Sequence, residues 1–153
     1  MWALLADLTR KSMIVTDTQI PGRFRVLGSL RAFGLAVLGD AGELTSTQVR
    51  LIDWLAGFEL RLARNPWGDA LTDLMNRITI ERDTIRYALE KAAALRHRSH
   101  PKLILLLARV LMNQDELAET RQILLGLLDN PLASTADRAM AHCILSLSAG
   151  RLG

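Results

Sequence analysis

The stretch that decides the fold runs from Pro101 to Gly153 and reads PKLILLLARVLMNQDELAETRQILLGLLDNPLASTADRAMAHCILSLSAGRLG. Its first part, from Pro101 to about Met112, is an apolar run with the three-to-four-residue spacing of a helix. A polar corner at Asn113–Asp115 separates it from a second helix, which stops at Asn130–Pro131 because proline cannot continue it. A third helix begins at Ser134 with the character of the first. This stretch predicts one and a half helical hairpins.

Large and small side chains recur at fixed positions in these helices. They are Ile104, Leu107, Ala108 and Leu111, then Thr120, Leu124 and Leu127, then His142, Leu145, Ser146 and Ala149, with Pro131 closing the first unit. The pattern resembles the tetratricopeptide (TPR) repeat, a helical hairpin whose copies stack into a groove. It departs from the family because the usual tryptophan and tyrosine are absent, Leu127 replaces a small residue and Gln114 replaces the corner glycine. A plain antiparallel helical bundle is the alternative, since its spacing is much the same.

Upstream, the same periodicity predicts further helices over about 2–13, 24–38, 45–64 and 66–95. Thr45-Ser46-Thr47-Gln48 has the form of a capping box, and Asn65-Pro66 marks one helix end and the next start. The last of these helices has a weak point at Ile78-Thr79-Ile80, where β-branched residues lower helix propensity. No segment predicts a strand.

Length and composition set the class of the molecule. The chain has 153 residues, of which 50% are hydrophobic and only 5% aromatic. That is enough for one domain with a core, and leucine and alanine favour helices over sheets. We therefore expect an all-α fold of antiparallel helical hairpins, about seven helices in all, TPR-like and right-handed at the C-terminal end. It would form a single domain over 1–153, with an N-terminal helical region over 1–98 and the repeat-like part over 101–153.

The resemblance implies a groove lined by the first helix of each hairpin. Its expected partner-binding residues are Lys102, Leu105, Arg109, Met112, Asn113, Met140, Cys143, Leu147 and Arg151. Methionine adapts to irregular partners and arginine can hold a carboxylate through two hydrogen bonds. The alternative is that the leucines are core residues and the basic residues are merely solvated. The predicted function is a non-enzymatic protein-protein interaction module or a small chaperone or adaptor, similar to secretion chaperones or to helical-repeat regions of bacterial regulators.

The final helix ends without a partner helix in the sequence. Leu145 and Leu152 should therefore be covered by self-association, as a homo-oligomer, or by a partner's helix.

A nucleic-acid-binding function is the second hypothesis. The net charge is only +3, but the residues from Arg86 to Arg109 hold several bases against the single acid Glu90. The bases expected to meet phosphates are Arg86, Lys91, Arg96 and Arg98. Aromatic residues are not interleaved with them for base stacking, and this hypothesis therefore ranks below a protein partner.

The histidines and the cysteine, the residue types that most often serve in catalysis or metal binding, do not form a motif in the sequence. His97 and His100 lie in a basic loop, and His142 and Cys143 are adjacent on a helix, so they point about 100° apart. We expect no enzyme activity, no metal and no cofactor. The lone cysteine, the absence of a signal-peptide pattern and apolar runs far shorter than a membrane span predict a cytoplasmic protein.

Overall fold

The structure is a computed structural model, and it describes residues 2–17, 20, 22–64 and 69–150. Eight helices and one two-stranded sheet form in these residues, which confirms the all-α class. Contacts divide the chain into two compact units, Met1–Ser46 and Thr47–Gly153. The prediction of one domain over 1–153 stays a prediction.

The first unit contains the short helix α1 (Trp2–Arg10), the strands β1 (Ile14–Thr16) and β2 (Phe24–Val26), and the helix α2 (Gly28–Asp40). The two strands pair antiparallel, with Ile14 opposite Val26. The expectation that no segment forms a strand is therefore wrong, and the helix predicted from residue 24 begins at Gly28. Ile-Val-Thr and Phe-Arg-Val are rich in β-branched and aromatic residues, which favour strands. When the two segments pair, their backbone N–H and C=O groups hydrogen-bond to each other, and helix periodicity in the sequence does not reveal such pairing.

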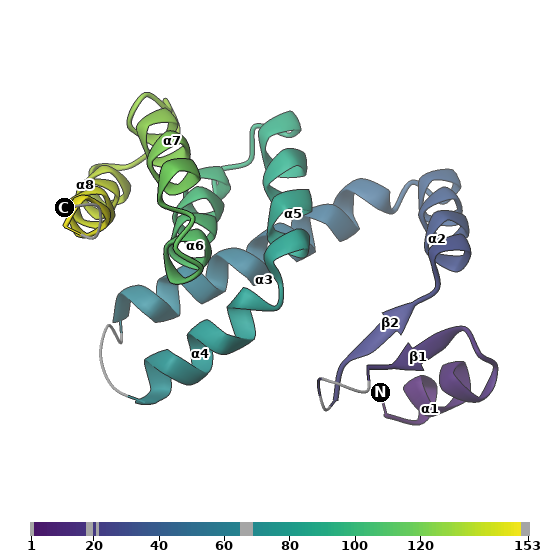
Figure 1. The fold of residues 1–153 in the computed structure, drawn as a ribbon. Coiled ribbons are helices and arrows are strands. Elements are labelled where there is room, and N and C mark those ends of the chain that lie inside the picture. The colour runs from purple at the N-terminus through teal and green to yellow at the C-terminus, as the bar shows by residue number, and fades with distance from the viewer. Residues whose placement is uncertain (1, 18–19, 21, 65–68, 151–153) are drawn as a thin grey trace. The chain divides into compact units, whose positions relative to one another are not determined.

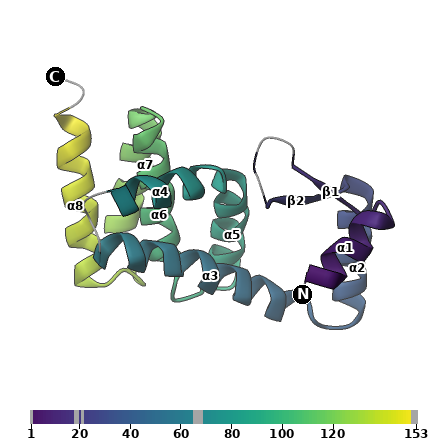
Figure 2. The ribbon, with the colours of Figure 1, turned by 90° about the horizontal axis from the view of Figure 1, so that it is seen from below.

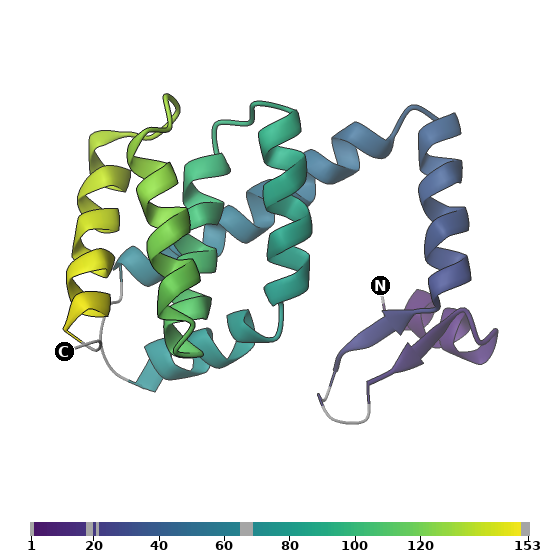
Figure 3. The ribbon, with the colours of Figure 1, turned by 45° about the horizontal axis from the view of Figure 1, so that its top comes forward.

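The second unit consists of six helices. They are α3 (Leu44–Arg64, which starts in the first unit), α4 (Asp69–Thr79), α5 (Arg82–Ala94), α6 (His100–Asn113), α7 (Leu117–Leu128) and α8 (Thr135–Ala149). Helices α5 to α8 follow one another up and down as neighbours, and α8 contacts α6 as well as α7 (Figures 1 and 3). Helix α3 runs across this row of helices (Figure 2). The antiparallel hairpins are as expected, whereas their membership of the TPR family stays a prediction.

The long helix expected over 66–95 is two helices. Helix α4 ends at Thr79, and α5 begins at Arg82 after a turn in which Glu81 donates its backbone N–H to the carbonyl of Ile78. The weak point predicted at 78–80 is confirmed. This break gives eight helices among the described residues, where the sequence predicts about seven. The start expected at Asn65-Pro66 lies outside the described residues.

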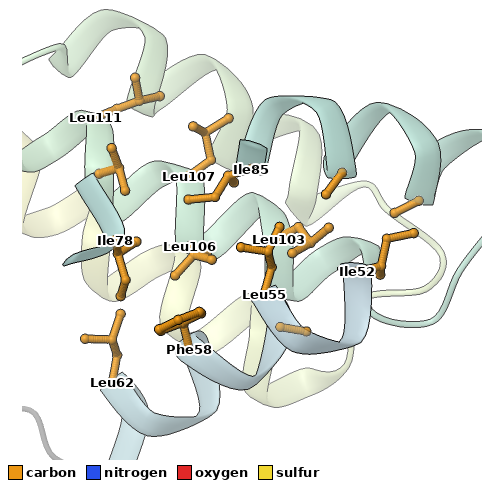
Figure 4. Packing of buried hydrophobic residues seen from close by; sticks show 14 residues of the cluster. Ile52, Leu55, Phe58, Leu62, Ile78, Ile85, Leu103, Leu106, Leu107 and Leu111 are labelled. Atoms are coloured by element: carbon orange, nitrogen blue, oxygen red, sulfur yellow. The ribbon is translucent and has the colours of Figure 1, made fainter. Parts of the chain in front are cut away.

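Helix α6 is the centre of the core because it is apolar on nearly every side. Leu103, Leu106 and Leu107 pack against α3 and α5 in one cluster, drawn in Figure 4. Leu105 and Ala108 pack against α7 and α8 in a second cluster. A helix that is apolar all round is buried. The α3 positions expected to face the core do so, and they include Ile52, Leu55, Phe58 and Leu62.

Local hydrogen bonds explain where these helices begin and end. The capping box forms at Ser134, whose hydroxyl accepts from the Asp137 backbone N–H while the Asp137 carboxylate accepts from the Ser134 backbone N–H. The capping box predicted at Thr45 is wrong, because α3 already begins at Leu44. The α6–α7 corner turns at Asp115, which has φ 58° and takes the place of a helix-ending glycine. In this corner Gln114 is an ordinary C-cap residue with negative φ.

In the described part of the chain, no helix has the length and apolarity that crossing a bilayer requires.

Candidate interaction surfaces

The α6 half of the predicted groove faces α3. Arg109 donates to the Glu59 carboxylate through two nitrogens, with Nε 2.9 Å from Oε2 and Nη2 3.1 Å from Oε1. The Glu59 side chain is only 3% exposed. Burial raises the pKa of Glu59, and the charge and hydrogen bonds of Arg109 oppose that rise. The arginine expected to hold a partner's carboxylate therefore holds one of this chain's own.

Lys102 is also paired within the chain. Its ammonium lies 2.6 Å from Oδ1 of Asp137, at the start of α8. Burial raises the pKa of Asp137, but hydrogen bonds from Lys102 and Ser134 outweigh it and hold the pKa below its ordinary value. This pair joins α6 to α8.

Leu105 is 1% exposed and belongs to the core. Between α3, α6 and α8 a small cavity of ≈ 90 Å³ lies around Leu105, and a hollow of ≈ 440 Å³ opens beside Lys102. Around Leu105 and Arg109 the α6 side of the predicted groove is covered by α3 and α8.

The α8 half of the predicted groove is open. Leu147 is 58% exposed and Cys143 is exposed. Met140 is half-buried, with its sulfur 3.1 Å from Nη2 of Arg109. Of the other predicted groove residues, Met112 is half-buried and Asn113 is exposed at the end of α6. Arg151 lies outside the described residues.

A second open surface lies between α7 and α8; these are the last two helices of the row (Figure 1). We call it the end groove. It has a volume of ≈ 460 Å³ and is lined by Arg121, Leu125, Leu145, Ser146, Ser148 and Ala149. Leu145 was expected to be exposed and in need of cover; it is half-buried at the edge of the second core cluster. Leu152 lies outside the described residues.

The basic stretch from Arg86 to Arg109 is largely neutralised by acids of this chain. Arg86 lies 2.7 Å from Glu119, and Lys91 lies 2.7 Å from the neighbouring Glu90. Lys102 and Arg109 are paired as described above. Arg96 and Arg98 are exposed and have no ion-pair partner among the described residues. The free positive charge of this stretch is therefore much smaller than the sequence indicates.

The histidines and the cysteine are separated. His100 lines a hollow of ≈ 610 Å³, and its Nδ1 is 2.9 Å from the side-chain amide nitrogen of Asn130. Burial lowers the pKa of His100, so that its ring is neutral near pH 7. His142 and Cys143 are both exposed on α8. Within the described ranges no three His, Cys, Asp or Glu side chains are placed to hold a metal ion.

The first unit exposes many apolar side chains. Among its described residues only Ile14 is a buried hydrophobic residue, and α2 has none. Trp2 on α1 and Phe33 on α2 are each more than half exposed. The unit therefore has little core of its own.

Comparisons with protein-family models, with curated proteins and with solved structures find no match to this chain. The resemblance to TPR proteins is thus carried by the sequence pattern alone.

The role of α3 is the feature that the sequence reasoning missed. A signal for it was present: Arg109 is the only charged residue between Leu103 and Asn113, and Glu59 lies among the apolar positions Phe58 and Leu62. Lone opposite charges on two apolar helix faces are costly to bury unless they pair. That complementarity could have placed α3 against α6.

Proposed function

We propose that this chain is a non-enzymatic protein-interaction module that binds a partner protein through the surface of α8. One observation carries the proposal. From Ala139 to Gly150 the sequence contains no Asp, Glu, Lys or Arg, yet α8 packs against α6 and α7 on one side only. Helices without charged side chains are usually covered on all sides, and exposed apolar surface marks interaction sites. A chaperone or adaptor role would use such a surface.

Nucleic-acid binding is the second candidate, favoured by the unpaired Arg96 and Arg98 beside each other in the α5–α6 loop. Two arginines can neutralise only a few phosphates, and the resulting affinity would be weak and steeply dependent on salt. We therefore rank this function below a protein partner.

The test is affinity purification of the tagged chain from its native cells in mild salt, with mass spectrometry and the ratio of absorbance at nucleic-acid and protein wavelengths. We expect a stoichiometric protein partner that is lost with Leu147→Glu or with a Glu substitution in the end groove, and kept with Leu95→Glu. Both leucines are exposed, at 58% and 39%, but Leu95 lies at the end of α5, away from α8. Nuclease-sensitive nucleic acid without a protein companion would refute the proposal. The proposal would also be refuted by a partner protein whose binding is unchanged by every substitution on the exposed side of α8 and in the end groove.

A further inference from the structure

We propose that the end groove between α7 and α8 receives one amphipathic helix of a partner protein, whose apolar side chains cover Leu125 and Leu145 and whose carboxylate pairs with Arg121. This inference rests on the proposed function and deepens it, because it names the kind of partner and the place where it binds.

The shape of the end groove suits a helix. Leu125 on α7 is 47% exposed, and Leu145 on α8 is half-buried beside it. Ser146 and Ala149 form the α8 edge, and such small side chains let a helix backbone approach closely. The groove therefore offers an apolar floor between two antiparallel helices.

The chain itself shows what fits against a pair of its helices. Helix α8 lies against α6 and α7 and buries Ala141, Ile144 and Ser148, which are spaced three and four residues apart. Ala141 and Ile144 pack there with Ala108 of α6 and Leu124 of α7. The pair α7 and α8 presents a similar surface on its other side. A further helix with the same apolar spacing would continue the row.

The charges around the end groove select an acidic helix. Among the described residues that line the groove, Arg121 alone is charged. It is exposed and has no ion-pair partner in the described ranges. The acid of α7, Glu119, pairs with Arg86 on α5. Arg138 of α8 is also occupied, because it donates to the backbone carbonyls of Leu128 and Asn130. An aspartate or glutamate of the bound helix is the group that would complement Arg121.

A second copy of this chain fits this charge pattern poorly. If its α7 or α8 entered the groove, it would bring only Glu119 and Asp137 as acids. Glu119 is paired with Arg86, and Asp137 is buried and paired with Lys102. Neither carboxylate is available to Arg121, so a second copy that entered through its own α7 or α8 would leave this arginine unpaired; we assign the groove to a helix of a different protein.

The experiment uses the full chain, and the probe is a displayed library of short amphipathic helical peptides. The positions that flank the apolar stripe of each peptide carry randomised charges. We expect the selected peptides to carry Asp or Glu beside an i, i+4 apolar pair. Fluorescence anisotropy should show their Kd weakened at least about tenfold by Leu125→Glu. Arg121→Glu should weaken binding about fivefold, and Lys in place of the peptide's acid should restore it.

The matched controls are Leu95→Glu and Arg98→Glu, which make the same changes at exposed residues outside the groove and should leave Kd unchanged. Circular dichroism and the Tm of each variant check that the fold is retained. The inference is overturned if no helical peptide is selected, if the peptides ignore Leu125→Glu, or if the charge exchange at Arg121 fails to restore binding. A native partner that requires Leu147 but is indifferent to Leu125 and Arg121 would overturn this inference and leave the proposed function standing.

Discussion

Removing Arg109 should destabilise the second unit in a way that depends on pH. In Arg109→Leu the Glu59 carboxyl, 3% exposed, would lose its three hydrogen bonds to the guanidinium. Breaking a buried pair from one side costs about 3–5 kcal/mol while the remaining group stays charged. Glu59 avoids that cost if it takes up a proton. The free energy needed to protonate the carboxyl then sets an upper limit on the cost of its charge.

That limit follows from linkage. An ordinary glutamic acid has a pKa of 4.5, and each pH unit above it costs about 1.4 kcal/mol to keep the carboxyl protonated. The part of the penalty that comes from ionisation therefore cannot exceed about 3.4 kcal/mol at pH 7, and falls to about 0.7 kcal/mol at pH 5. Lys102 is close enough to favour the charged carboxylate, which lowers the penalty somewhat.

The assay is urea denaturation followed by far-ultraviolet circular dichroism, at pH 5 and at pH 7. Arg109→Leu should lose about 2–3 kcal/mol of unfolding free energy at pH 7 and clearly less at pH 5. Glu59→Gln combined with Arg109→Leu should lose this pH dependence, since no carboxyl remains at position 59 to titrate and the penalty becomes flat with pH. Arg121→Leu, the same change at an exposed arginine, should stay within about 0.5 kcal/mol of the parent chain. A penalty for Arg109→Leu that equals the control, or is the same at both pH values, would refute the buried pairing.

Three further predictions concern local structure and acid stability. Ser134→Ala removes the hydroxyl of the capping box and should lower the unfolding free energy by about 1 kcal/mol, whereas Ser146→Ala, at an exposed site on the same helix, should change it by a few tenths at most. Arg96 has φ 48°, so Arg96→Gly should relieve strain and raise the Tm by an amount equivalent to about 0.5–1 kcal/mol; Leu95→Gly, at φ −83°, should lower it instead. The folded-state pKa of Asp137 lies below 3.8, so the ionised carboxylate stabilises the fold above that pH and its contribution is lost as the pH falls below it. Acid titration of Asp137→Asn, followed by circular dichroism, should therefore show a smaller loss of stability below pH 3.8 than the parent chain shows.

The sequence by itself determined the helical class, most helix boundaries and the core positions of α3. The spacing of Ile52, Leu55 and Leu62, and the punctuation at Ser134 and in the corner before Leu117, are local signals that act through neighbours three or four residues away. It missed the two short strands because a three-residue strand is stabilised by its partner strand and not by its own periodicity.

Only the tertiary structure decided which faces are open. The predicted groove residues Lys102, Leu105 and Arg109 share one face of α6, as their spacing indicates, but α3 and α8 cover that face: Glu59 of α3 pairs with Arg109, and Asp137 of α8 pairs with Lys102. The spacing of one helix states which side chains point together; it does not state which distant helix packs against them, because that choice depends on contacts between residues fifty positions apart, such as Glu59 and Arg109. The end groove, with Leu125 and Arg121, depends on the tertiary structure for the same reason: it forms only where α7 and α8 pack together.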